Sequence, residues 1–140
     1  MTLFETIDKL KYIALQQPNV RTFVEGNIYE KLNANPSVEY GVICITQGRH
    51  TREEYFNNFN FNIFYVDRLV SDLENNRLEA QSIGIEVITN LIKRFCEENE
   101  VEYNNLTFDT FTERFSDECS GVYATISLQV EADLICKEDY

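Results

Sequence analysis

The chain of 140 residues has no tryptophan, one methionine, one histidine and two prolines. It also lacks an apolar run of the roughly 20 residues that a membrane-spanning helix needs, so we expect no membrane span. The amino-terminal segment MTLFETIDKLKY is amphipathic and has no basic region followed by an apolar core, so we expect no secretory signal.

The cysteines are few, widely separated and form no C-x-x-C pair: Cys44, Cys96, Cys119 and Cys136. This spacing excludes a zinc knuckle and a thioredoxin-like redox motif. Cys44 and Cys96 lie in apolar segments, where we expect them to serve as small core residues. Free cysteines used in this way indicate folding in a reducing cytoplasm.

Common catalytic motifs are also missing. The chain contains no phosphate-binding glycine loop, no dinucleotide fingerprint, no nucleophile elbow and no zinc-protease helix. His50 is a conceivable general base, but no motif links it to a serine or cysteine, and a solvated loop histidine explains it better. We therefore predict a protein that is not an enzyme and that needs neither a cofactor nor a metal.

Positive charge is scarce, and the net charge of −12 is unevenly placed. Residues 97–140 contain 12 acidic and 2 basic side chains, whereas residues 1–96 are close to balanced. This distribution argues against a protein that grips nucleic acid by its phosphates. A solvated acidic face that keeps the chain soluble is sufficient to explain it.

Residues 71–98 carry the strongest helical pattern. Ser71 and Glu74 form a potential capping box at its start. Apolar residues then recur at three- and four-residue steps, which predicts a long amphipathic helix. The members of this stripe are Leu73, Arg77, Ala80, Gly84, Val87, Leu91 and Phe95, and Ile83, Ile88 and Ile92 widen it. Acidic residues at the carboxyl end of this helix oppose its dipole: Glu97, Glu98 and Glu100.

Two long segments show the alternation of strands. In residues 55–69, phenylalanine, isoleucine and tyrosine at positions 59, 61, 63 and 65 alternate with Asn58, Asn60 and Asn62. The asparagine row faces either water or a neighbouring subunit. Residues 122–134 alternate throughout, which predicts one core face and one wet face or interface. We expect a further strand over 102–115 and a turn over 116–121.

A first helix is expected over residues 2–17. Two adjoining stripes define its apolar face, which has some polar edge: Leu3, Ile7, Leu10 and Ala14, and Phe4, Lys11 and Leu15. With shorter strands and one helical turn before residue 36, the order predicts a single α+β domain over residues 1–140. Its sheet is mostly antiparallel, with the two main helices packed on one face.

Aromatic residues are the main surplus, at 13% of the chain. They occur on both faces of the strand over 55–69, so Phe56 and Phe64 should be exposed unless a partner covers them. The preceding polar loop, residues 48–53, contains Arg49, His50 and Arg52, which could contact an acidic partner or a phosphate. These five residues form the predicted interface.

The order and composition of five segments resemble a known family. The segments are residues 17–20 (QPNV), 61–69 (FNIFYVDRL), 75–84 (NNRLEAQSIG), 111–115 (FTERF) and 121–124 (GVYA). They resemble the tail-terminator and head–tail connector (neck ring) proteins of tailed bacteriophages, particularly crAss-like or Bacteroides-type phages. The resemblance covers nearly the whole chain.

This resemblance implies a tail-terminator-like α+β subunit without enzymatic activity or cofactor. It implies a homo-oligomeric ring, six- or twelve-fold, at the head–tail junction or the end of the tail tube. Portal, connector or tail proteins would be its neighbours. DNA would pass through the ring without specific binding. The protein would be made in the host bacterial cytoplasm and would reside in the virion, away from membranes.

A second hypothesis comes from a different class. The aromatic sheet face could instead serve a small cytoplasmic ligand-binding or regulatory domain. A monomer at all concentrations with a defined small-molecule pocket would favour this alternative.

Overall fold

The computed structural model describes residues 1–33, 39–69, 76–103, 106–114 and 118–132. Within these ranges the chain forms three helices and seven strands. In chain order they are α1 Leu3–Leu15, β1 Thr22–Glu25, α2 Ile28–Asn33, β2 Val42–Gln47, β3 Thr51–Arg52, β4 Phe56–Arg68, α3 Asn76–Asn99, β5 Glu102–Tyr103, β6 Phe108–Arg114 and β7 Glu118–Glu131.

The strands form one mixed sheet whose centre is the long antiparallel pair of β4 and β7. On one side of β4 lie β2 and β3, and β1 joins β2 in parallel. On the far side of β7 lie β6 and β5, which pair with different parts of the same edge. Every pair except β1–β2 is antiparallel.

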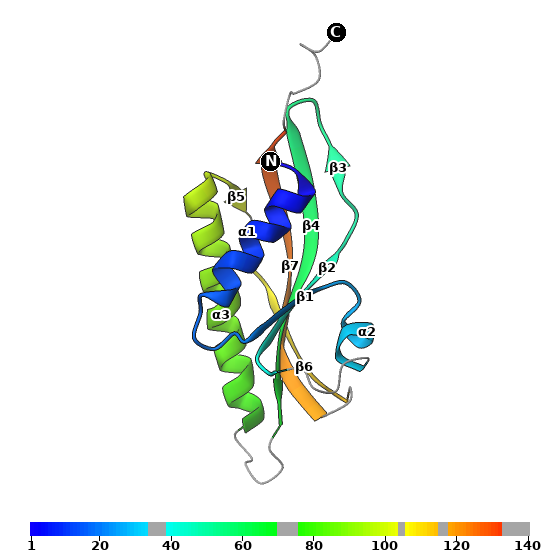
Figure 1. The fold of residues 1–140 in the computed structure, drawn as a ribbon, viewed down its shortest axis with the longest axis vertical. Helices are drawn as coiled ribbons and strands as arrows, with labels where there is room; N and C mark the ends of the chain where they lie inside the picture. Colours follow the sequence, from blue (N-terminus) through cyan, green and yellow to red (C-terminus); the bar gives the residue numbers. More distant parts are fainter. Residues whose placement is uncertain (34–38, 70–75, 104–105, 115–117, 133–140) are drawn as a thin grey trace.

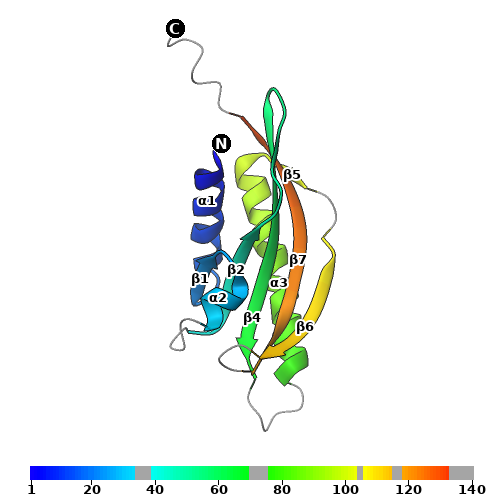
Figure 2. The ribbon, with the colours of Figure 1, turned by 90° about the vertical axis from the view of Figure 1, so that its right-hand side faces the viewer.

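The two long helices cover one face of the sheet. Figures 1 and 2 show α1 and α3 side by side on that face, with the short α2 on the opposite face. The larger core lies between α1, α3 and the odd-numbered residues of β4, which include Phe59, Phe61, Ile63 and Tyr65. A smaller apolar cluster joins α2 to the other face through Ile28, Leu32, Val42, Cys44, Val66 and Cys119.

The α+β class, the mostly antiparallel sheet and the placement of both long helices on one face are as the sequence predicts. The alternation of β4 and β7 is confirmed as well, because the residues assigned to the core face are buried: Phe59, Phe61, Ile63 and Tyr65 of β4, and Val122, Ala124, Ile126, Leu128 and Val130 of β7. The burial of Cys44 and Cys96 is confirmed. The potential capping box at Ser71 and Glu74 lies outside the described residues.

Three local predictions are wrong. Residues 118–121 continue β7 instead of forming a turn, since Ser120 and Gly121 pair with both β4 and β6. The strand expected over 102–115 is two strands, β5 and β6. The stripe of Phe4, Lys11 and Leu15 is exposed, because the sheet side of α1 is formed by Thr6, Leu10, Ile13 and Ala14.

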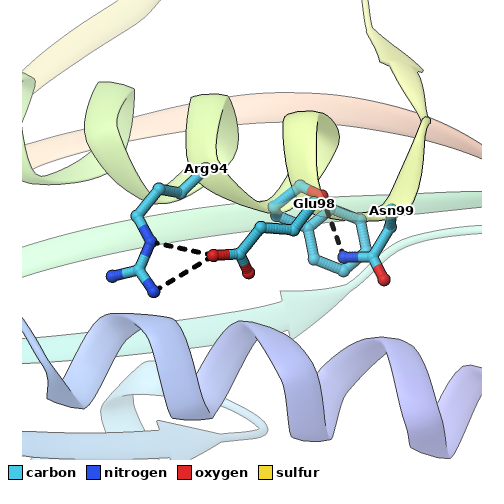
Figure 3. Close-up of polar contacts among 4 residues, drawn as sticks. Arg94, Glu98 and Asn99 are labelled. Carbon is cyan, nitrogen blue, oxygen red and sulfur yellow. Dashed lines mark hydrogen bonds and ion pairs between the residues drawn. The ribbon is translucent and has the colours of Figure 1, made fainter.

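The carboxyl end of α3 compensates in part for its acidic residues. Arg94 forms an ion pair with Glu98 at 3.2 Å, and the side-chain amide of Asn99 donates to the Phe95 carbonyl at 2.9 Å (Figure 3). Glu100 then adopts a left-handed conformation with φ 53°. The Val101 N–H donates to the Cys96 carbonyl at 3.0 Å. This is a Schellman-type end in which glutamate occupies the position that glycine usually fills.

Replacing Glu100 by glycine should therefore stabilise the protein. A left-handed backbone costs an L-residue about 1 kcal/mol or more, and glycine avoids this cost. We expect the free energy of unfolding, measured by equilibrium denaturation in urea, to rise by about 1 kcal/mol. Glu100→Ala is the matched control, because it removes the charge and keeps the strained backbone. An equal gain in both variants would assign the effect to the charge alone.

Candidate interaction surfaces

Four of the five predicted interface residues lie together. Arg49, His50, Arg52 and Phe56 belong to the segment that joins β2 to β4, and we call residues 48–56 the hairpin arm. Phe64 lies on β4 about 26 Å from Phe56, at roughly 3.3 Å per residue. The structure thus brings four of these residues into one feature and separates the fifth from it.

The hairpin arm extends past the ends of α1 and α3 (Figures 1 and 2). Its turn is closed by a hydrogen bond from the Glu53 N–H to the Phe56 carbonyl at 2.8 Å. The same turn is held to the end of β7, since the Ala132 N–H donates to the Tyr55 carbonyl at 2.7 Å. Backbone hydrogen bonds therefore hold this projection in place.

The surface of the arm combines charge with aromatic side chains. Arg49 and Arg52 are exposed, as are the neighbouring aromatics Tyr55 and Phe56. Glu53 and Glu54 at the turn are exposed too, so the arm is not basic overall. Its cations occupy β3 and the loop before it, and its acids occupy the turn. Exposed aromatics beside arginine are typical of protein interfaces.

His50 has a structural position, which differs from the solvated loop residue expected from the sequence. Its Nδ1 accepts a hydrogen bond from the Asn60 N–H at 3.1 Å, and its Nε2 lies 3.0 Å from the Gln47 Oε1. The ring also meets Phe59 and Phe61 edge-on, with centroids 5.3 and 5.6 Å apart. His50 thus fills the gap between β2 and β3 along the edge of β4.

Phe64 is half-buried, because the chain itself covers much of it. Its ring centroid lies 5.1 Å from that of Tyr123 and 6.2 Å from that of Phe111. It also packs against the small apolar cluster under α2. The sequence indicates an aromatic on this face correctly, but it cannot reveal partners that lie about 50 residues further along the chain.

The centre of this sheet face is polar and uncharged, and we call it the polar sheet face: Asn58, Asn60, Asn62, Thr125, Ser127 and Gln129. The acidic residues Glu102, Asp109 and Glu131 lie around it. Several of its groups bond within the chain. The Thr125 hydroxyl donates to the Asn62 Oδ1 at 2.7 Å, and the Asn60 amide donates to the Arg49 carbonyl at 2.6 Å. Two open hollows of about 250 and 390 Å³ lie on this face, the larger beside Arg49, Asn60 and Asn62.

The outer side of α1 is a surface that the sequence interpretation misses. Phe4 is 78% exposed, Tyr12 68% and Leu15 43%. The helical projection places Leu10, Ile13 and Ala14 on the side opposite Phe4 and Leu15. Since either stripe could have faced the sheet, periodicity alone does not identify the exposed one.

The perturbed ionisable groups of the described residues are buried or half-buried. Burial raises the pKa of the Cys44 and Cys96 thiols to about 11, which keeps both thiols protonated and unreactive. Burial and then the nearby Asp67 carboxylate raise the pKa of Tyr65. Burial also raises the pKa of Asp67, against the opposing effects of the Arg68 N–H, the Arg21 cation and the Tyr65 hydroxyl. These shifts arise from packing under α3 and α2.

No protein-family model matches the chain, and no curated protein matches it. In the ranges that the structure describes, no group of three or more His, Cys, Asp or Glu side chains is placed to hold a metal ion. None of the described helices is both long and apolar enough to cross a membrane.

Proposed function

We propose that this protein is a structural subunit that acts by assembly and not by catalysis. Its proposed place is a homo-oligomeric ring, six- or twelve-fold, at the phage head–tail junction or the end of the tail tube. The observation that carries the proposal is the hairpin arm. The arm projects from the body, is fixed by its own backbone hydrogen bonds, and presents Tyr55 and Phe56 to the outside.

A projecting arm of this kind suits contact with a neighbour. An arm that binds a different surface of the next subunit makes a head-to-tail contact, and such contacts close into rings when the rotation allows. Tyr55 and Phe56 would supply buried contact area, and Arg49 and Arg52 would pair with acidic groups. The neighbours in the proposed virion site are further copies and the adjoining portal, connector or tail proteins.

The charge of the chain is compatible with DNA passing through such a ring. Exposed acids are spread over the carboxyl end of α3 and over β5, β6 and β7, and include Glu97, Glu98, Glu102, Asp109 and Glu131. Acidic groups facing a lumen would repel phosphate and prevent adhesion. On this proposal the protein is made in the bacterial cytoplasm and functions in the virion.

Reversing the charge of the arm should block assembly without unfolding the subunit. We expect Arg49→Glu combined with Arg52→Glu to abolish rings detected by light scattering and electron microscopy across a concentration series. Both side chains are exposed, so the melting temperature should change little. Lys31→Glu combined with Lys93→Glu is the matched control, because it makes the same change in net charge on α2 and α3. Rings that persist in the arm variant, or that vanish equally in the control, would exclude a specific role for the arm.

The larger hollow on the polar sheet face favours one alternative function. Its volume of about 390 Å³ is within the range of small-molecule sites, and Arg49, Asn60 and Thr125 line it. A ligand-binding domain would remain a monomer at all concentrations. It would also co-purify with a small molecule that native mass spectrometry detects, and Asn60→Ala would release that molecule.

A further inference from the structure

The helix α1 is apolar on two opposite sides. Its inner side packs Leu10, Ile13 and Ala14 into the core. Its outer side exposes Phe4, Tyr12 and Leu15. Figure 2 shows α1 at the outer edge of the molecule, beside α3. Large exposed apolar side chains gathered on one side of a helix are typical of an interaction site, so we expect an occupant on this outer side.

The charges on the outer side identify that occupant. Phe4, Asp8, Lys11, Tyr12 and Leu15 fall within about 100° of the helix circumference, and all five are exposed. When two copies of α1 pack antiparallel on this side, a residue of one copy can lie opposite the residue of the other copy for which the two residue numbers add to 19. Phe4 then meets Leu15 of the other copy, and Asp8 meets Lys11. The same contacts recur on the other side of the two-fold axis. A parallel arrangement would place Asp8 against Asp8 and Lys11 against Lys11.

We propose that the outer side of α1 is a self-association surface, on which α1 of a second copy packs antiparallel about a two-fold axis near Lys9 and Leu10. Phe4 and Leu15 form its apolar ends, and Asp8 and Lys11 form reciprocal ion pairs between them. Tyr12 lies beside Asp8 of the other copy. Such a contact is isologous and closes on itself.

This pairing does not depend on the proposed ring. A two-fold contact alone gives a dimer, and within a ring it would join two rings into a stack. One helix of 13 residues on each copy makes a small interface. We therefore expect a concentration-dependent dimer at the weak end of specific association, with a dissociation constant on the order of micromolar.

The first test compares two exposed apolar residues. Sedimentation equilibrium of the full chain, whose monomer mass is 16.4 kDa, should show a monomer–dimer equilibrium. Phe4→Ser should weaken association at least tenfold, because it removes an apolar end of the contact twice in each dimer. Leu78→Ser is the matched control, since Leu78 is 52% exposed at the start of α3, away from the outer side of α1. If the wild-type chain is already a ring, the readout is the ring mass, which should be halved by Phe4→Ser.

The second test fixes the arrangement of the helices. Asp8→Lys alone and Lys11→Asp alone each place like charges in every cross-pair, so each should be monomeric. An equimolar mixture of these two variants restores opposite charges at both pairs, so it should form a heterodimer. The double variant Asp8→Lys, Lys11→Asp should dimerise like the wild type. Circular dichroism melting of each variant confirms that the monomers are folded.

Three results would overturn the proposal. One is a wild-type chain with neither dimers nor stacked rings up to millimolar concentration. Another is dimers that survive Phe4→Ser, which would place the contact on another surface. The third is dimers that depend on Phe4 but ignore the charge reversals, which would exclude the antiparallel self-pairing. The arm variant with Arg49→Glu and Arg52→Glu should retain the α1 pairing, so failure of either proposal is recognised separately.

Discussion

Gly121→Ala is expected to remove much of the folding stability of the protein. Gly121 lies in β7 between Val66 of β4 and Phe111 of β6, at the centre of the sheet. A methyl group there would overlap the backbone carbonyl of Tyr65. Neither β4 nor β7 can move away, because near this position β4 is paired with β2 and β7, and β7 is paired with β4 and β6. Overpacking with side chains costs about 1–3 kcal/mol, and a backbone obstacle should cost at least about 3 kcal/mol.

This cost is large against the 5–15 kcal/mol of a typical domain. Urea denaturation should therefore show a much lower midpoint for Gly121→Ala, or no folded baseline. Gly48→Ala serves as the control. At Gly48 the nearest atom to an added methyl group is the Asn60 carbonyl oxygen at 3.2 Å, and the site is exposed. We expect a change within about 1 kcal/mol there. A Gly121→Ala protein with the wild-type midpoint would mean that β4 and β7 do not approach each other as described.

The sequence predicts the faces of the long strands well because one face of each is buried almost without interruption. In β7, Val122, Ala124 and Ile126 are buried, while Tyr123 and Thr125 on the opposite face are more accessible. A shift by one residue would bury the polar set, so the pattern determines the face. Gly121 shows the limit of this argument. Glycine favours turns locally, but here a neighbouring strand requires it.

The pairing of strands could not be predicted from local pattern. The parallel pairing of β1 with β2 and the pairing of β3 with β4 depend on which strands become neighbours in the folded sheet. His50 illustrates this, because its ring accepts the Asn60 N–H that no strand residue reaches. Its neighbours in the sequence are polar, so the sequence favours a solvated loop.

The prediction of the candidate surfaces has the same limit, because exposure depends on residues that are distant in the sequence. Phe64 is predicted to be exposed, yet Phe111 and Tyr123 cover part of it. Phe4 is predicted to be buried, yet it is exposed, because Leu10, Ile13 and Ala14 provide the stripe that fits the sheet and α3. Amphipathic periodicity shows that a helix has an apolar side. Where a helix has two, only the tertiary structure decides which one forms the core and which one is left for a partner.

Tyr65→Ala is expected to cost about 3–5 kcal/mol, the range for losing a large aromatic from a core. Tyr65 is fully buried on β4, and its hydroxyl donates toward the Asn19 carbonyl at 3.4 Å. Tyr65→Phe keeps the ring and loses only the hydroxyl contacts, so it should cost about 1 kcal/mol. A similar loss in both variants, measured by urea denaturation, would show that the hydroxyl contributes the stability and not the packed ring.

The same residue explains why α3 has a glycine in its interior, and a double-mutant cycle tests this explanation. A methyl group at Gly84 would lie 2.9 Å from the Tyr65 Cδ2 and 2.8 Å from the Val122 Cγ2. Alanine is preferred over glycine in helices by about 1 kcal/mol, so Gly84→Ala destabilises only if this crowding outweighs the preference. Removing the ring with Tyr65→Ala relieves the contact with Cδ2, and it leaves the contacts with the Val122 Cγ2 and with the Cβ of residue 65 at 3.2 Å. Gly84→Ala should therefore cost less in the Tyr65→Ala protein, with a coupling energy of about 0.5–3 kcal/mol between the two sites. An equal cost in both backgrounds would leave Val122 and the Cβ of residue 65 as the obstacles, and the Tyr65 ring would then not set the distance between α3 and the sheet.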